Sequence, residues 1–409
     1  MKLLLQNTTK NVEARIRITG SKSESNRLLI LKALFPSITI NNLSNSDDTQ
    51  VMQKALASQE HEIDIHHAGT AMRFLTSYFA IQENRSVILT GSHRMKERPV
   101  KILVEALNSL GADIRYLEKQ GYPPLHIRGK KLSGGKVRLK ANVSSQYISS
   151  LLLIGARLQN GLEIELEDKV TSLPYIQMTL TLLKKLGVSC SFKGHTVKVS
   201  PFHEIPLAEF TVESDWSSAS YYYSLAAIAP KANIRLSSYH KNSLQGDHIL
   251  QDIYRFFGVD TRFSDGVMWL THLGAAKNTV LKQDLTQAPD IAQTIAVTCF
   301  ATGKACHLTG LHTLKIKETD RLEALKTELG KLGAKIQVTD SELILSPSGS
   351  IKKGVAINTY DDHRMAMAFA PLAMKEPILI NNAEVVSKSY PDFWNDLKLA
   401  GIDHIKQTL

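Results

Sequence analysis

The stretch ALNSLGADI, residues 106–114, has the pattern of an apolar helix that ends at Gly111 and is followed at once by a strand. Glycine at this place is a helix C-terminal signal, because it readily adopts the left-handed conformation that ends a helix. The pattern returns about every seventy residues, in LLKKLGVSC (182–190), IYRFFGVDT (253–261), LGKLGAKIQV (329–338) and NDLKLAGIDHI (395–405). A weaker copy without the glycine is DDTQVMQKALASQEHEI (47–63). We therefore interpret the chain as a repeat of similar units.

A second kind of helix alternates with the first. These helices are rich in Ala, Ser and Leu and open near residues 21, 67, 144, 215, 290 and 361. Small and apolar residues on nearly all sides predict helices buried against one another. Strand-like segments such as LEIELED (162–168) lie between the helices, so each unit is expected to be mixed α/β. Six units of this size fit two domains of three units each, with the midpoint near residues 210–214.

The composition is that of an ordinary globular protein with excess positive charge. The 409 residues are 43% hydrophobic and 22% charged, and the formal net charge is +10. There is no apolar run near the roughly 20 residues of a membrane span, the start MKLLLQNTTK lacks a signal-peptide core, and three scattered cysteines fit a reducing compartment. Scattered Lys and Arg without interleaved aromatic residues disfavour nucleic acid. We expect a cytoplasmic protein whose positive charge serves acidic small molecules.

One buried helix begins in an unusual way. In ITGSKSESNR, residues 18–27, the cations Lys22 and Arg27 stand with Ser23 at a helix N-terminus, where the backbone already favours an anion. A bound anion, shared by the cations and free backbone N–H groups, would explain this arrangement. When the stretch is taken alone, a solvated helix start with incidental charges is the favoured explanation.

Unusual polar residues stand near most of the other helix starts as well. They are Gly69 in AGTAMR, Arg98 in MKERP, Ser144, Ser145 and Gln146 in SSQ, Ser172 in SLPY, Asp290 in PDIAQ, Lys317, Glu318 and Arg321 in KETDR, His363 and Arg364 in DDHR, and Lys388 in SKSYPDF. If the helix N-termini converge, their dipoles and N–H groups add to these cations and form an anion trap between the two domains. KETDR alone could instead be an ion-paired surface face, and SSQ a helix cap.

Taken together, the motifs closely resemble one known family, the 3-phosphoshikimate 1-carboxyvinyltransferases or EPSP synthases. The matching stretches, in the family's order and over nearly the whole chain, are GSKSESNR, AGTAMR, MKERP, SSQ, SLPY, DWSSAS, PDIAQ, KETDR, DDHRMAM and SKSYPDF. The resemblance implies a two-domain inside-out α/β barrel of the enolpyruvyl transferase and RNA phosphate cyclase type, with six βαβαββ-type units, three per domain. It implies one domain of residues 1–20 plus 214–409, a second of residues 21–213, and an active site in the interdomain cleft.

The resemblance also implies a reaction and a set of roles. The enolpyruvyl group of phosphoenolpyruvate passes to the 5-hydroxyl of shikimate 3-phosphate through a tetrahedral intermediate, and phosphate leaves. The residues that match catalytic positions are Asp290 as base, Lys22 and Glu318 as proton donor and relay, and His363 and Lys388 at phosphate departure. Those that match shikimate 3-phosphate positions are Lys22, Ser23, Arg27, Ser144, Ser145, Gln146, Ser172, Asp290 and Lys317. Those that match phosphoenolpyruvate positions are Lys22, Gly69, Arg98, Gln146, Arg321, Arg364 and Lys388. No cofactor, metal, membrane or nucleic acid is implied, and a monomer is expected.

Three positions depart from the family pattern. His67 stands where Asn is usual, Phe74 where Pro is usual, and Thr313 where Asn is usual, which puts the ligand geometry and the inhibitor response in question. Gly69 is retained, and we therefore expect glyphosate to inhibit.

Two other functions remain open on the sequence alone. The sister family, UDP-N-acetylglucosamine 1-carboxyvinyltransferase, has the same architecture, but it usually carries a cysteine ahead of its Arg-Pro element and lacks KETDR. The loop GSHRMKERP, residues 91–99, has no cysteine. A basic nucleic-acid-binding protein is the alternative of a different class.

Overall fold

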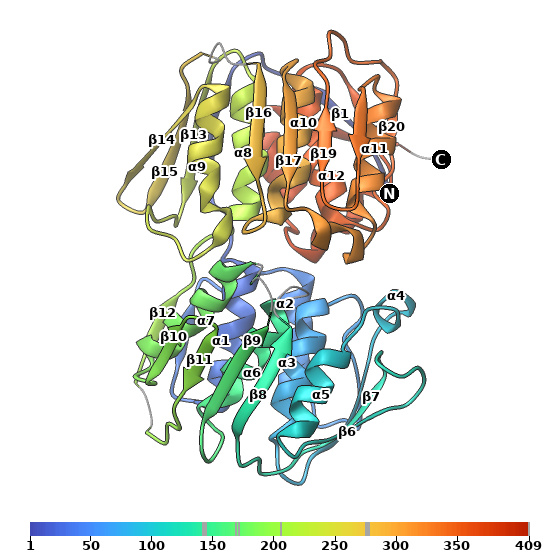
Figure 1. Cartoon of the computed structure of the whole chain (residues 1–409). Helices are drawn as coiled ribbons and strands as arrows, with labels where there is room; N and C mark the ends of the chain where they lie inside the picture. Colours follow the sequence, from blue (N-terminus) through green and yellow to red (C-terminus); the bar gives the residue numbers. More distant parts are fainter. Residues whose placement is uncertain (141–144, 168–169, 171, 205–206, 275–278, 408–409) are drawn as a thin grey trace. The chain divides into compact units, whose positions relative to one another are not determined.

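The structure is a computed structural model that describes residues 1–140, 145–167, 170, 172–204, 207–274 and 279–407. Contacts divide the chain into two compact units (Figure 1): unit 1 is Met1–Thr19 with Glu213–Leu409, and unit 2 is Gly20–Val212. These boundaries lie one residue from those of the predicted domains. Within the described residues, no helix is both long and apolar enough to cross a membrane.

Unit 2 contains two complete copies of the βαβαββ repeat. The first has β4 (Glu62–Asp64), β5 (Ser86–Thr90), β6 (Asp113–Tyr116) and β7 (Leu125–Arg128); the second has β8 (Gly135–Lys140), β9 (Leu162–Glu167), β10 (Cys190–Lys193) and β11 (Thr196–Val199). In each sheet the first two strands are parallel, and the last two form a hairpin whose second strand pairs antiparallel with the second strand of the repeat. The predicted mixed α/β unit is confirmed.

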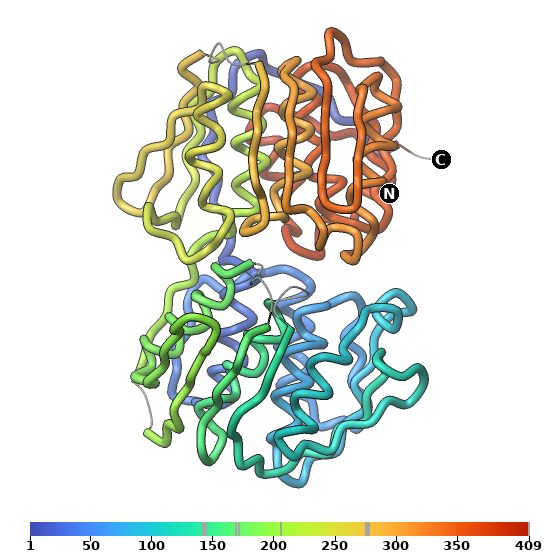
Figure 2. The backbone as a smooth tube through the Cα atoms, viewed as in Figure 1, coloured from blue at the N-terminus to red at the C-terminus, as the bar shows by residue number. Residues whose placement is uncertain are grey.

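Unit 1 repeats this topology in three sheets. They are β2 (Val12–Ile16), β13 (Ala232–Ser237), β15 (Val267–His272) and β14 (Val259–Ser264); β16 (Val280–Asp284), β17 (Ala305–Thr309), β19 (Leu343–Leu345) and β18 (Ile336–Val338); and β20 (Ala356–Ile357), β21 (Ile378–Ile380), β1 (Lys2–Asn7) and β22 (Ile402–Gln407). The N-terminal segment therefore supplies one strand to each of two sheets, β2 beside β13 and β1 between β21 and β22. Figure 2 shows this blue segment running within the unit formed by the C-terminal half of the chain.

The glycines that were expected to end helices do so. Gly111, Gly187, Gly258, Gly333 and Gly401 have φ angles between 80° and 101°, and a strand hairpin follows the first four. Helix α2 (Asp47–Ala57), the copy without glycine, leads instead directly into β4. Its repeat is reduced to a two-stranded sheet of β3 (Thr39–Asn41) and β12 (Glu209–Thr211).

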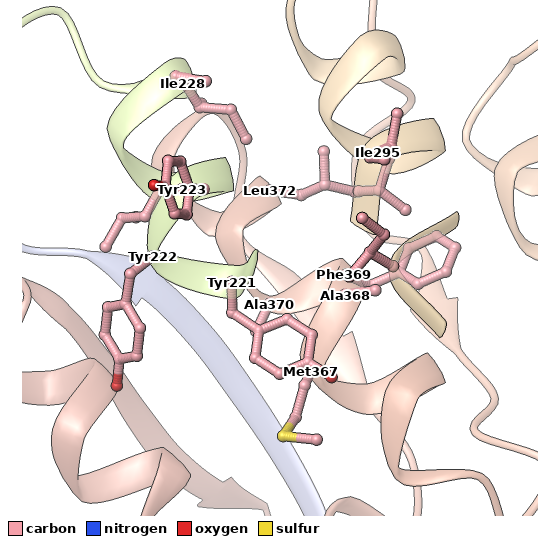
Figure 3. Close-up of a cluster of buried hydrophobic side chains, with 14 of the residues drawn as sticks. Tyr221, Tyr222, Tyr223, Ile228, Ile295, Met367, Ala368, Phe369, Ala370 and Leu372 are labelled. Atoms are coloured by element: carbon pink, nitrogen blue, oxygen red, sulfur yellow. The ribbon is translucent and has the colours of Figure 1, made fainter. Parts of the chain in front are cut away.

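The core of each unit is a set of helices that contact one another. In unit 2 these are α1 (Lys22–Leu34), α3 (Gly69–Ala80) and α6 (Ser145–Gly155); in unit 1 they are α8 (Trp216–Ile228), α10 (Ala292–Ala301) and α12 (His363–Phe369). Figure 3 shows Tyr221, Ile295 and Phe369 from the three helices of unit 1 packed together. The remaining helices are α4 (His93–Lys96), α5 (Lys101–Ser109), α7 (Leu173–Lys185), α9 (Leu250–Ile253), α11 (Arg321–Lys331) and α13 (Phe393–Leu399). Helices inside and sheets outside form the predicted inside-out fold.

Hydrogen bonds between hydroxyl side chains join the buried helices to one another. Ser220 and Thr294 join α8 to α10 at 3.0 Å, and Ser77 and Ser150 join α3 to α6 at 2.6 Å. Small hydroxyl side chains let the helices approach closely while each buried oxygen finds a partner. The serine and threonine residues of these helices therefore also form hydrogen bonds between them.

Candidate active site

The starts of four helices meet within unit 1. Asp290 lies in a 3-10 turn (Pro289–Ile291) directly before α10, Arg321 is the first residue of α11, and Arg364 is the second residue of α12. Ser217, near the start of α8, completes the group through a hydrogen bond from Arg364 Nη2 at 3.2 Å. Four N-terminal dipoles therefore point their positive ends toward one group of side chains.

Asp290 is the centre of this group, because three cations surround its carboxylate. Arg321 Nη1 lies 2.9 Å and Lys317 Nζ 3.4 Å from Oδ1, and Arg364 Nη2 lies 3.2 Å from Oδ2. Arg364 Nη1 also donates to the Asp290 carbonyl oxygen at 3.1 Å. Burial alone raises the pKa of the Asp290 carboxyl, but the three cations, Arg364 most strongly, outweigh it and hold the pKa well below its usual range.

A second carboxylate, Glu318, lies between two other cations. Lys388 Nζ is 2.7 Å from Oε1, and Arg321 Nη2 is 3.0 Å from Oε2. Arg321 also pairs with Asp362 through Nε at 2.7 Å, and its side chain is almost fully buried. Arg321 therefore bridges three carboxylates and fixes the distance between the two candidate acid–base groups.

Two predicted catalytic residues have surroundings that the motif pattern did not indicate. His363 is the first residue of α12 and only 2% exposed, with Nδ1 3.8 Å from Asp362 Oδ1. Lys388 ends a 3-10 helix (Ala383–Lys388) instead of opening a helix, so its charge is not added to an N-terminal dipole. Its ammonium group still reaches the site through Glu318.

Asp247 and Asp362 also belong to this group, although no role was predicted for either. Ser217 donates a short hydrogen bond to Asp247 Oδ2, and the other oxygen of Asp247 is buried with no hydrogen-bond partner among the described residues. Burial, aided by the negative charge of Asp290, raises the pKa of Asp247 to about 7. Asp247 is the second residue of a 3-10 turn (Gly246–Ile249) that leads into α9 (Leu250–Ile253), a helix start that was not among those predicted.

In unit 2, Lys22 is the first residue of α1, and Arg27 lies further along the same helix. Lys22 Nζ lies 3.2 Å from Asp48 Oδ2 on α2. Arg27 is 2% exposed and donates to Thr179, the Ser23 carbonyl, Ser149 and the Tyr175 carbonyl. These contacts use four of its five N–H groups within the described residues.

Gly69 and Arg98 lie in contact. A Cβ at Gly69 would come within 2.6 Å of Arg98 Nη1 and 3.0 Å of Arg73 Nη1, so any larger residue would force the Arg98 guanidinium to move. Gln146 lies close to Gly69, because its side-chain amide donates a hydrogen bond to the hydroxyl of the next residue, Thr70, at 3.3 Å. The starts of α3 and α6 are thus brought together with the Arg98 loop.

The predicted serine ligands of unit 2 stand at or near helix starts, apart from Ser144. Ser145 is the first residue of α6 and is buried, and Ser172 caps α7 with a left-handed φ of 54°. Ser144 lies outside the described residues. The side chains of Ser23, Ser145 and Ser172 stand at three different helix starts within one unit.

Two of the three departures from the family pattern, Phe74 and His67, have local partners. The Phe74 ring lies 5.3 Å from the Arg27 guanidinium and supports it by a cation–π contact. His67 Nδ1 lies 2.8 Å from the Ser92 hydroxyl. The Thr313 hydroxyl is buried with no hydrogen-bond partner in the part of the chain that the structure describes.

The fold and these cation-rich helix starts define the enolpyruvyl transferase class. The structure of EPSP synthase from Acinetobacter baumannii matches with a TM-score of 0.79 at 21% identity, covering 99% of this chain and 100% of that one. The enolpyruvyl transferase NikO from Streptomyces tendae matches with a TM-score of 0.75 at 14% identity, covering 100% and 99%. At these identities the likeness shows the fold.

Sequence comparison gives the family. The sequence model of the EPSP synthase (3-phosphoshikimate 1-carboxyvinyltransferase) family matches residues 53–397. A 3-phosphoshikimate 1-carboxyvinyltransferase of Bacteroides fragilis is 47% identical over 97% of both chains, and one of Haemophilus influenzae is 35% identical over 95% of this chain and 96% of its own. The chain belongs to the EPSP synthase family. It is therefore a transferase of the shikimate pathway, which is favoured over the two alternatives that the sequence left open.

Proposed function

We propose that this chain transfers the enolpyruvyl group of phosphoenolpyruvate to the 5-hydroxyl of shikimate 3-phosphate, with the side chains gathered at its helix starts. The observation that carries the proposal is the Asp290 carboxylate held by Lys317, Arg321 and Arg364. Such a group offers a base for a hydroxyl proton together with several cations for phosphate and carboxylate groups.

The cations around Asp290 also suggest how the base becomes active. A carboxylate with a strongly lowered pKa accepts a proton poorly. Phosphate and carboxylate groups of the substrates compete with Asp290 for Lys317 and Arg364, which weakens the interactions that keep its pKa low. Binding of the anionic substrates thus prepares Asp290 to take the proton from the attacking hydroxyl.

Lys22 and Glu318 are the proposed proton donor and relay for the opposite transfer, which adds a proton to the methylene carbon of phosphoenolpyruvate. Lys388, whose Nζ lies 2.7 Å from Glu318, is proposed to stabilise the departing phosphate. His363, at the start of α12, adds a hydrogen-bonding group near the same phosphate. No step in this scheme requires a group from outside the chain.

Unit 2 carries further residues that are proposed to bind the substrates. Gly69, Arg98 and Gln146 are assigned to phosphoenolpyruvate, and Lys22 is shared by both substrates. The remaining shikimate 3-phosphate ligands from this unit are Ser23, Arg27, Ser144, Ser145 and Ser172. Because one chain carries both sets of residues, we propose that a cytoplasmic monomer is the working form.

A metal-free assay of phosphate release tests the proposal. Protein, shikimate 3-phosphate and phosphoenolpyruvate are mixed with a chelator, and free phosphate is followed with time. Release that requires both substrates is expected, with Asp290→Asn lowering kcat by about 100-fold or more. UDP-N-acetylglucosamine in place of shikimate 3-phosphate should give none. Release with the nucleotide sugar alone as acceptor would contradict the proposed function.

A further inference from the structure

Two consecutive residues directly before α12 have a backbone conformation that side chains disfavour. Tyr360 and Asp361 both have a φ of 54°. Asp tolerates this left-handed region, but for a bulky residue such as Tyr it is a strained outlier. The pair leads straight into Asp362 and Arg364, so the direction in which α12 starts depends on how this turn is held.

A buried carboxylate on α11 contacts the turn. Glu328 is 0% exposed and accepts a hydrogen bond from the Tyr360 hydroxyl at 2.5 Å and from the Asn358 backbone N–H at 3.1 Å. Lys331 Nζ lies 2.7 Å from both carboxylate oxygens. Two of the groups that satisfy this buried charge therefore come from the segment between β20 and α12.

The same helix also holds the other side of the turn. Arg321, at the start of α11, donates from Nε to Asp362 at 2.7 Å and from Nη2 at 3.3 Å. Asp362 in turn accepts from the Arg364 backbone N–H at 2.9 Å and thereby caps α12. The strained pair is tied to α11 both before and after, and this double attachment can balance the strain.

We propose that Glu328 and Tyr360 are positioning residues for Arg364. Their hydrogen bond maintains the left-handed turn and so sets where the first turn of α12 places the Arg364 guanidinium. Without it, residues 360–361 relax toward negative φ and the guanidinium moves away from Asp290. The inference deepens the proposed function and rests on it in one respect, namely that Arg364 binds phosphoenolpyruvate.

The first test removes one oxygen atom. Tyr360→Phe in the full chain is expected to raise KM for phosphoenolpyruvate about tenfold while KM for shikimate 3-phosphate changes less than about threefold. The matched control is Tyr223→Phe, which removes a buried hydroxyl that lies 2.8 Å from Thr261 in the same unit. It should leave both KM values unchanged. Equal increases in the two KM values for Tyr360→Phe would count against the proposal.

The second test relieves the strain. Glycine adopts positive φ without the clash of a Cβ, so Asp361→Gly makes the left-handed turn less dependent on the clamp. Added to Tyr360→Phe, it should return KM for phosphoenolpyruvate to within about threefold of the starting protein. A double variant with KM as high as that of Tyr360→Phe overturns the proposal.

The third test does not depend on activity. The backbone N–H groups of Asp362, bonded to the Thr359 carbonyl at 2.9 Å, and of Arg364 should exchange with solvent at least about tenfold faster in Tyr360→Phe, but not in Tyr223→Phe. Unchanged exchange refutes the clamp. If the unaltered protein releases no phosphate from its two substrates, the proposed function fails, whereas the exchange result still decides whether Tyr360 positions α12.

Discussion

Asp247→Asn should make unit 1 more stable at neutral and alkaline pH. The Asp247 carboxyl is 2% exposed, lies near Asp290, Asp215 and Arg364, and has a pKa raised from 3.8 to about 7. The folded protein therefore holds a proton that the unfolded chain has lost, and the stability that this proton contributes is present below pH 4 and is lost as the pH rises through 7. Asparagine keeps an oxygen for the Ser217 hydrogen bond and carries no charge at any pH.

The expected magnitude follows from the difference between the two pKa values. Each pH unit between them changes the free energy of unfolding by about 1.4 kcal/mol, so the full effect is about 4 kcal/mol. Between pH 5 and pH 8, the variant should gain about 3 kcal/mol relative to the unaltered protein, and the gain should level off above pH 7. Groups common to both proteins cancel in this difference.

Tryptophan fluorescence during urea unfolding measures this difference for unit 1 alone. All three tryptophans, Trp216, Trp269 and Trp394, belong to that unit. Asp265→Asn, at an exposed turn of the same unit, is the matched control, and its stability difference is subtracted from that of Asp247→Asn at each pH. If the Asp247→Asn difference is constant from pH 5 to pH 8, Asp247 is not protonated in the folded state and the reasoning is refuted.

Three further changes test other parts of the structure. Gly69→Ala places a Cβ 2.6 Å from Arg98 Nη1, so it should raise KM for phosphoenolpyruvate and weaken inhibition by glyphosate; an unchanged inhibition constant would contradict the role given to this contact. Arg98→Ala should weaken phosphoenolpyruvate binding far more than shikimate 3-phosphate binding, and equal losses by calorimetry would refute the division of the site. Leu5→Ala removes a fully buried side chain from the strand between β21 and β22 and should lower the urea-unfolding free energy by about 2–5 kcal/mol; a loss below 1 kcal/mol would mean that β1 is not an integral strand.

The repeat could be predicted from the sequence because its signals are local. A glycine after an apolar helix specifies a left-handed helix end whatever surrounds it, and Gly111 and Gly333 behave alike in different units. The pairing of β2 with β13 could not be predicted from such signals, because the two strands lie far apart in the chain and each pattern would suit several partners. Only the family resemblance indicated where the N-terminal residues belong.

The same distinction applies to the candidate site. Cations at helix starts are visible in the sequence, since a positive residue beside a positive dipole is a local anomaly. Their acidic partners are not, because Asp48 and Asp247 meet Lys22 and the Ser217–Arg364 pair only through packing.

The carboxylates that pair with these cations explain how a cation-rich site can fold before any ligand binds. Like charges packed at helix starts would repel one another, but Lys22 is paired with Asp48 and Lys388 with Glu318. A ligand anion must therefore displace a carboxylate that is already paired with the cation, because the cation is not waiting unpaired. A single weak anion gains little binding free energy from this exchange. Substrates that carry both phosphate and carboxylate groups can displace several partners at once. The paired acids thus set a threshold that favours multiply charged metabolites over simple anions.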